Sequence, residues 1–223
     1  MHQTLAAHPH LADALNQALG VYDHRPAEHA GRVRTLALSL GDRLGVDGNE
    51  REALSWAALF HDLGKISVSR AILRKAGPLT DLEWIEMKRH PIVGADILLA
   101  ISPLLQPIAA GVRGHHERWD GAGYPDGLVG EQIPRVARII AVADTFDAMT
   151  RARPYRKRRY GPKEATDAIQ CAAGSQFDPL MVAAFVALRQ VAVNPDDEDG
   201  GSRSDGDDGG QTKEPPMPPR IAA

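Results

Sequence analysis

The chain has 223 residues, enough to bury one substantial hydrophobic core, and its hydrophobic (43%) and charged (25%) fractions are ordinary for a globular protein. Its only cysteine, Cys171, excludes an intrachain disulfide and a cysteine-rich zinc site. Because no apolar run approaches the roughly 20 residues of a membrane span and no secretory signal opens the chain, we expect a cytoplasmic protein that does not bind membranes.

Alanine and leucine are plentiful in the chain and aromatic residues are sparse (5%), which favours helices over strands. A short helix is predicted over residues 11–19, within an N-terminal helix or arm of residues 1–20. A longer helix is predicted over residues 27–44, where apolar residues recur every three or four positions. The next helix is expected to begin at residue 49 or 50, to run to Leu63 and to end at Gly64.

Capping residues and prolines mark the later helices. Thr80 followed by Glu83 is a capping box, which predicts a helix from residue 80 toward His90. Further helix starts are predicted at five prolines: Pro91, Pro103, Pro134, Pro162 and Pro179. Strand patterns are weak, so the sequence predicts an all-α fold of about eight or nine helices in one domain, residues 21–193.

One loop, residues 120–127 (DGAGYPDG), interrupts the helical pattern. Its three glycines and one proline cannot continue a helix, and they tolerate backbone angles that other residues avoid. It is either an ordinary connector or an exposed recognition turn that presents Tyr124. The density of special residues favours the recognition turn.

The charge of the chain is unevenly distributed. Residues 194–223 carry eight acidic and three basic residues, a net charge of −5, and few apolar residues, so we predict a disordered acidic tail. The remaining body has a net charge of +2, and six of its cations lie in residues 151–160 (RARPYRKRRY). This cluster would suit an anionic partner or form a solvated face. Because aromatic residues do not alternate with it, we expect no nucleic-acid polymer as partner.

Histidines and carboxylates recur along the helical body. Imidazole and carboxylate groups bind divalent cations, and two such ions about 3.5–4 Å apart clamp a phosphate and activate water for attack. The pair His61-Asp62 would supply a ligand to one ion and a carboxylate bridge to both, with Lys65 close to a bound phosphate. A lone histidine on a helix is more often structural, and the dipeptide by itself is a weak signal. Five helical histidines together favour a metal site: His29, His61, His90, His115 and His116.

The order and spacing of these residues resemble the HD superfamily of metal-dependent phosphohydrolases. Five segments are similar to the HD-GYP subfamily: HDLGKI, KRHPIVGADIL, HHERWDGAGYPDGL, VADTFDAMTRARPYR and GSQFDP. The similarity runs from about residue 22 to residue 185. It implies an all-α HD-type domain that hydrolyses cyclic di-GMP, a bacterial signalling molecule, to linear pGpG or GMP at an iron or manganese centre.

The resemblance also implies roles for individual residues. The ligands of a first metal would be His29, His61, Asp62 and Asp144. Asp62 would bridge to a second metal, whose other ligands would be His90, His115 and His116. Lys65, Tyr124, Arg153 and Arg156 would contact substrate, and Lys65 would act in catalysis together with Asp62. The residues bracing the loop would be Arg118, Asp120, Gly121, Gly123 and Pro125, and Asp147 would orient a ligand histidine.

Two departures from the family pattern narrow these expectations. Arg25 occupies the position where members with three metals carry a glutamate, so we predict two metals, iron or manganese, with zinc, nickel or magnesium as alternatives. Only about twenty residues precede the similar region, where relatives carry a sensory domain. Either control comes from expression, a partner or substrate supply, or the sequence is a fragment of a longer chain.

Two other functions stay open on the sequence. The first is an HD phosphohydrolase acting on another cyclic dinucleotide, such as cyclic GMP-AMP. The second is a catalytically silent module that contacts diguanylate cyclase (GGDEF) domains through the GYP loop. Because every matched ligand position is filled, the sequence favours an enzyme.

Overall fold

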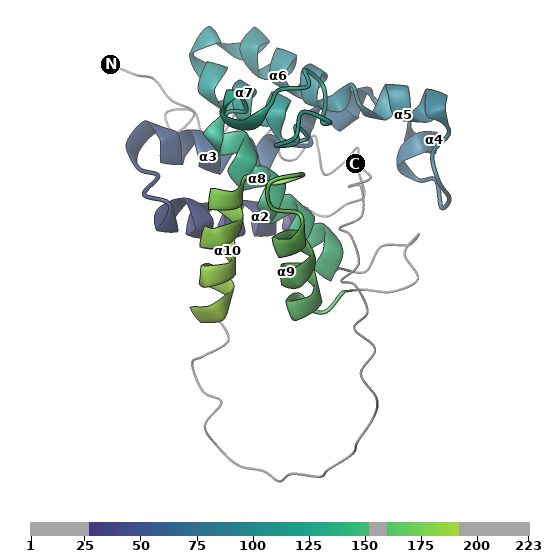
Figure 1. The fold of residues 1–223 in the computed structure, drawn as a ribbon. Helices are drawn as coiled ribbons and strands as arrows, with labels where there is room; N and C mark the ends of the chain where they lie inside the picture. The colour runs from purple at the N-terminus through teal and green to yellow at the C-terminus, as the bar shows by residue number, and fades with distance from the viewer. Residues whose placement is uncertain (1–26, 152–159, 192–223) are drawn as a thin grey trace, which may run out of the picture.

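The computed structural model describes residues 27–151 and 160–191 (Figure 1). These residues form α-helices and short 3₁₀ helices and contain no β-strand, which confirms the predicted all-α class. Four features predicted from the sequence lie outside the described residues: the helix over residues 11–19, Arg25, the pair Arg153 and Arg156, and the acidic tail.

The elements follow one another with short connections. In chain order they are α2 (Ala27–Arg43), α3 (Gly48–Phe60), η2 (Leu63–Ser67), α4 (Arg70–Leu73), α5 (Asp81–Met87), α6 (His90–Ile101), η3 (Pro103–Leu105), α7 (Gln106–Gly114), η4 (Gly130–Gln132), α8 (Arg135–Thr150), α9 (Pro162–Cys171) and α10 (Pro179–Val191).

Most predicted helix starts are confirmed. The capping box of Thr80 and Glu83 opens α5, and three prolines occupy the first turns of α6, α9 and α10 as predicted. Pro134 differs slightly, because it caps α8 instead of beginning it, and the helix expected at Pro103 is a 3₁₀ turn that leads into α7.

The helix expected to reach Leu63 ends earlier, at Phe60. His61 caps it, and the chain then tightens into the 3₁₀ turn η2. Gly64 lies within that turn and packs directly against the backbone of α6, where an added Cβ would come 1.9 Å from the carbonyl oxygen of His90. Close backbone approach, not helix termination, is therefore the structural requirement for glycine here.

Helix α8 lies at the centre of the domain and packs against α2, α3, α7, α9 and α10 (Figure 1). Every residue from 139 to 145 is buried, which is the pattern of a helix surrounded on all sides. Asp144 therefore reaches the interior from the most enclosed helix of the fold.

Helices α4 and α5 project from the body and have a small apolar cluster of their own (Figure 1). Val68, Ile72 and Met87 are its buried members, with Trp84 packed against them. The end of α5 is thereby held immediately before His90, the first residue of α6.

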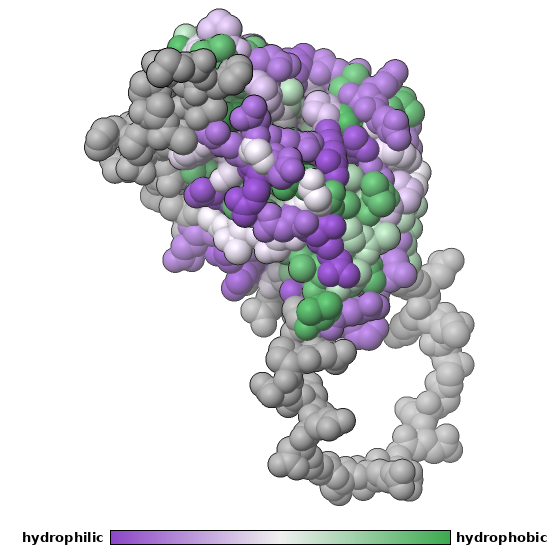
Figure 2. Space-filling model, turned by 90° about the vertical axis from the view of Figure 1, so that its left-hand side faces the viewer, coloured by the Kyte–Doolittle hydropathy of each residue, from purple (hydrophilic) through white to green (hydrophobic). Residues whose placement is uncertain are grey.

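Hydrophilic side chains cover much of the face shown in Figure 2, where apolar groups form smaller patches. No helix among the described residues combines the length and the apolar character that crossing a bilayer requires.

Candidate metal centre

Two groups of buried side chains in the interior have the composition of metal sites. The first contains His29, His61 and Asp144, and the second contains His90, His115 and His116. Within each group, one possible ligand atom from every residue lies within 4.8 Å of the others. The structure thus brings six of the seven residues that the sequence predicted as ligands into two groups, and Asp62, the seventh, belongs to neither group.

Helix ends supply most of these side chains. His29 lies in the first turn of α2, His61 follows α3, and His90 begins α6. His115 and His116 follow α7, and Asp144 extends from α8. Side chains at the ends of several helices can meet in the interior of the domain without interrupting those helices.

Three of the histidines are oriented by the same local contact. The Nδ1 atom of each lies within hydrogen-bond distance of the main-chain carbonyl three residues earlier: His61 to Ala58 (2.8 Å), His90 to Met87 (2.8 Å) and His115 to Val112 (2.6 Å). A carbonyl accepts, so Nδ1 carries the proton and Nε2 is left with a lone pair. This is the tautomer that a metal ligand requires.

His29 is oriented by a carboxylate instead of a carbonyl. Its Nδ1 lies 2.7 Å from Asp147 Oδ2, and Arg32 donates to both oxygens of Asp147, at 2.6 and 3.0 Å. Burial alone would lower the pKa of His29, but hydrogen bonds to Asp144 and Asp147 raise that pKa to about 9. The orienting contact predicted for Asp147 is present, and a cation bound at Nε2 would replace the second proton of His29.

Asp62 lies between the two groups. Its Oδ2 atom is 3.5 Å from Nε2 of His61 in the first group, and its Oδ1 atom is 3.6 Å from Nε2 of His90 in the second. Lys65, which is only 2% exposed, donates to Oδ2 at 2.7 Å. One carboxylate that faces both groups is the arrangement expected of a bridging ligand.

The charges of the two groups also suit a cation. Burial lowers the pKa of His90, of His115 (to about 4) and of His116, so these three imidazoles are neutral near pH 7. Burial would raise the pKa of Asp144, but the hydrogen bond from His29 and the electrostatic attraction of His61 and His29 together lower that pKa and keep the carboxylate ionised. Neutral imidazoles and an ionised carboxylate are the ligand forms of divalent metals.

Two buried polar atoms near the centre have no hydrogen-bond partner among the described residues. His116 Nε2 and the Tyr124 hydroxyl are buried, and neither forms a hydrogen bond within the described ranges. Buried polar atoms of native proteins are nearly always satisfied, so an unsatisfied imidazole nitrogen beside two other histidines indicates a missing ligand. The donor set therefore fits a metal ion.

The loop after α7 covers the second group. The Tyr124 ring stacks on His116, with the ring centres 4.9 Å apart and the planes at 28°. Burial raises the pKa of the Tyr124 hydroxyl, and the nearby carboxylates Asp62 and Asp144 raise it further, so the group stays protonated. Pro125 follows Tyr124 through a cis peptide bond.

An arginine–aspartate pair and two glycines determine the conformation of the loop. Arg118 donates to both oxygens of Asp120 (3.0 and 2.6 Å), and Asp120 accepts from the amide of Ala122. Gly121 has a φ of +78°, which favours glycine. At Gly123 an added Cβ would lie 2.3 Å from the amide nitrogen of Arg118, so only glycine fits.

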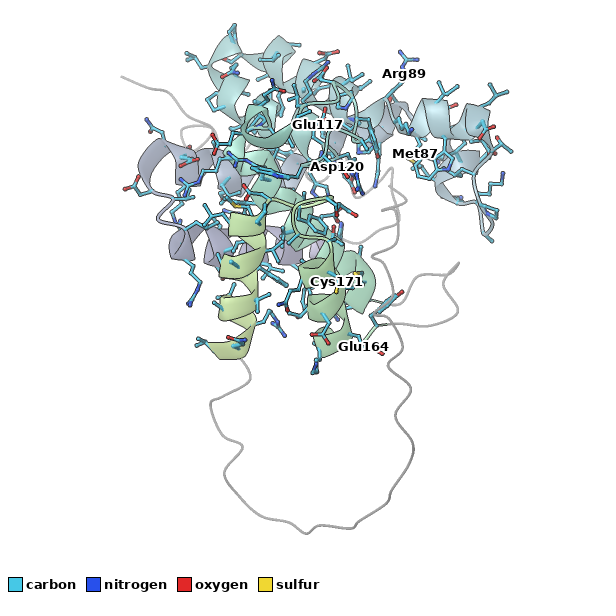
Figure 3. All side chains as sticks on the ribbon, in the orientation of Figure 1. Met87, Arg89, Glu117, Asp120, Glu164 and Cys171 are labelled. Atoms are coloured by element: carbon cyan, nitrogen blue, oxygen red, sulfur yellow. The ribbon has the colours of Figure 1, made fainter. Side chains whose placement is uncertain are left out.

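Glu117 is a contributor that sequence reasoning missed. It follows His116 directly, is 4% exposed, and accepts hydrogen bonds from three loop amides: Asp126 (2.7 Å), Gly127 (3.2 Å) and Leu128 (3.1 Å). Figure 3 shows Glu117 and Asp120 on this loop. The sequence feature that could have indicated this role is the position of a charged residue directly between two histidines and a glycine-rich turn.

Replacing Glu117 by leucine is expected to destabilise the fold by about 3 kcal/mol, because three loop amides lose the buried carboxylate that accepts their hydrogen bonds. Glu117→Gln keeps one acceptor oxygen and should cost about half as much. Urea unfolding measures both effects. Glu131→Leu, in the exposed turn η4, is the control and should change stability by less than about 0.5 kcal/mol. Equal effects of Glu117→Leu and Glu131→Leu would contradict the bracing role.

Comparison with known proteins gives consistent matches. A family model described as "HD domain" matches residues 3–181. The cyclic di-GMP phosphodiesterase response regulator RpfG of Xanthomonas campestris is 39% identical over 176 residues, covering 78% of this chain and 46% of that protein. A cyclic di-GMP phosphodiesterase of Thermotoga maritima is 38% identical over 179 residues, covering 80% and 48%. The chain spans about half the length of these two relatives.

Two solved structures share the fold. A cyclic GMP-AMP-specific phosphodiesterase of Vibrio cholerae matches with a TM-score of 0.60 at 22% identity, covering 83% of this chain and 48% of that one. An HDG"Y"P protein of Bdellovibrio bacteriovorus matches with a TM-score of 0.61 at 17% identity, covering 84% and 65%.

Proposed function

Because the chain belongs to the HD domain family, we propose that it is a metal-dependent phosphodiesterase that hydrolyses cyclic di-GMP to linear pGpG or GMP. The observation that carries this proposal is the position of Asp62, whose two carboxylate oxygens face two separate groups of buried ligands. A phosphodiester needs its charge neutralised and its phosphorus exposed to a nucleophile, and paired cations meet both needs.

Two divalent ions, iron or manganese, with zinc, nickel or magnesium as alternatives, are the proposed cofactors. The first would be held by His29, His61, Asp62 and Asp144, and the second by Asp62, His90, His115 and His116. When bound, such a pair polarises the phosphate and provides an activated water. Asp147 orients His29, and three main-chain carbonyls orient His61, His90 and His115, so that Nε2 of four of the five proposed ligand histidines is aimed inward.

Lys65, Tyr124, Arg153 and Arg156 are the proposed substrate contacts. Lys65 donates to Asp62, so its ammonium lies beside the carboxylate that would bridge the ions, where it can stabilise charge that develops on the phosphate. Tyr124 presents a buried hydroxyl that lacks a partner among the described side chains and can donate to substrate. The two arginines lie outside the described residues, and their role rests on the sequence.

Cyclic GMP-AMP is a second candidate substrate. The names of several relatives support it, including 3'3'-cGAMP-specific phosphodiesterase 3 of Vibrio cholerae, which is 41% identical over 130 residues, covering 58% of this chain and 28% of that protein. Parallel assays with cyclic di-GMP and cyclic GMP-AMP at equal concentration separate the two. Contact of the loop with a diguanylate cyclase (GGDEF) domain and a cytoplasmic location remain predictions.

Removing the metals tests the proposed function. Protein purified without oxygen should contain two ions per chain and hydrolyse both cyclic di-GMP and bis-p-nitrophenyl phosphate. Chelation should abolish both activities, and returning iron or manganese should restore them. Chelation should also lower the melting temperature, because a ligand that binds only the folded state stabilises it. Three tightly bound ions would contradict the metal count, and undiminished turnover after complete metal removal would contradict the mechanism.

A further inference from the structure

Lys88 is a cation at the edge of the metal centre that has no assigned role. It lies in the short junction between α5 and α6, two residues before His90. Its side chain is exposed, and its ammonium lies 5.5 Å from the centre of the Tyr124 ring. Lys88 is thus on the rim of the centre, on the side of the second group.

Tyr124 connects this rim to the interior. Its ring stacks on His116, and its hydroxyl is buried without a hydrogen-bond partner among the described residues. One side chain therefore contacts a ligand of the second group and also the Lys88 ammonium. Any substrate that reaches the centre past Tyr124 passes within range of Lys88.

The other cations around the loop are already paired. Arg113 forms a bidentate salt bridge with Asp126 (2.7 and 2.7 Å), and Arg118 forms one with Asp120. Lys65 donates to Asp62. Lys88, in contrast, makes no salt bridge within residues 27–151 and 160–191. It can accept an anion without first losing a carboxylate partner.

A cyclic dinucleotide carries two phosphodiester groups, each with one negative charge. When one phosphate occupies the metal centre, the other must lie outside it, because the macrocycle holds the two apart. We propose that Lys88 binds this second phosphate and so favours cyclic dinucleotides over substrates with a single phosphate. The inference rests on the proposed function and concerns the recognition of the substrate, not the chemical step.

The test compares Lys88→Met with Lys88→Arg and with Arg89→Met in the full chain. Methionine keeps the apolar stem but removes the charge, and arginine restores the charge. Arg89, the neighbouring exposed cation, projects outward from the α5–α6 junction in Figure 3 and is the matched control. Steady-state kinetics are measured with cyclic di-GMP, which has two phosphates, and with bis-p-nitrophenyl phosphate, which has one.

Lys88→Met is expected to raise KM for cyclic di-GMP about tenfold and to change kcat less than about twofold. The ionic contact with the second phosphate would be equally strong in the bound substrate and in the transition state, so its loss should weaken substrate binding without slowing the chemical step. Its kcat/KM for bis-p-nitrophenyl phosphate should equal that of the unmodified protein. Lys88→Arg should recover most of the lost affinity, and Arg89→Met should resemble the unmodified protein. Salt screens the attraction between Lys88 and the phosphate, so KM for cyclic di-GMP should depend less on salt concentration in Lys88→Met than in the unmodified protein.

Each result has one consequence. Equal KM values for Lys88→Met and Arg89→Met with cyclic di-GMP would overturn the role of Lys88. The proposed function would still stand in that case, provided that the unmodified protein hydrolyses cyclic di-GMP. A parallel loss on both substrates would also overturn it, because the effect would then lie at the metal centre. Failure of the unmodified, metal-loaded protein to cleave either phosphodiester would overturn the proposed function itself and the role of Lys88 with it.

Discussion

Replacing Asp62 by alanine should lower kcat/KM by about 10³-fold or more on both cyclic di-GMP and bis-p-nitrophenyl phosphate. The reason is geometric, because the two carboxylate oxygens of Asp62 face different groups of predicted ligands, 3.5 Å from Nε2 of His61 and 3.6 Å from Nε2 of His90. In the proposed centre, this carboxylate would be a ligand of both ions. The loss should therefore affect a small substrate as severely as a large one.

Metal content and folding are measured alongside activity. Asp62→Ala should retain fewer than two ions per chain, while its helical circular dichroism stays near that of the unmodified protein. Asp62→Asn keeps the size of the side chain and separates the loss of charge from the loss of volume. Asp42→Ala, which removes an exposed carboxylate near the end of α2, is the control and should be fully active. An Asp62→Ala protein with normal turnover would refute the bridging assignment.

Replacing Gly64 by alanine should destabilise the fold by about 3 kcal/mol and abolish binding of the second metal. The added Cβ would lie 1.9 Å from the carbonyl oxygen of His90 and 2.6 Å from the amide nitrogen of Gly94. Both atoms belong to backbone, which cannot rotate away as a side chain can. Helix α6 must therefore shift, and His90 at its first residue shifts away from Asp62.

Urea unfolding and metal quantification check this result. Gly77→Ala is the matched control, because an added Cβ there meets no heavy atom within 4 Å and the backbone is not in the left-handed region. That control should be neutral or slightly stabilising, by up to about 1 kcal/mol, since alanine restricts the unfolded chain. If Gly64→Ala behaves like Gly77→Ala, then the close packing of η2 on α6 does not position His90.

Local signals in the sequence predicted several of the helix starts. The capping box at Thr80 and the prolines before α6, α9 and α10 act within a few residues of themselves, so they can be recognised without any knowledge of the fold. The predicted end of α3 at Gly64 was wrong by several residues. A glycine that ends a helix and a glycine that admits a neighbouring backbone look the same in one sequence.

The chemical composition of the centre was also readable from the order of residues, through the resemblance of the His and Asp motifs to a known family. The arrangement of those residues was decided by tertiary structure, because α2, α3, α6, α7 and α8 must pack before their side chains meet. Only the packed chain places the Glu117 carboxylate against three loop amides and Gly64 against α6. It also places Lys88 beside Tyr124, where Lys88 forms no salt bridge with another described residue. These contacts join residues whose separation along the chain carries no local signal, and their energies depend on burial that exists only after folding.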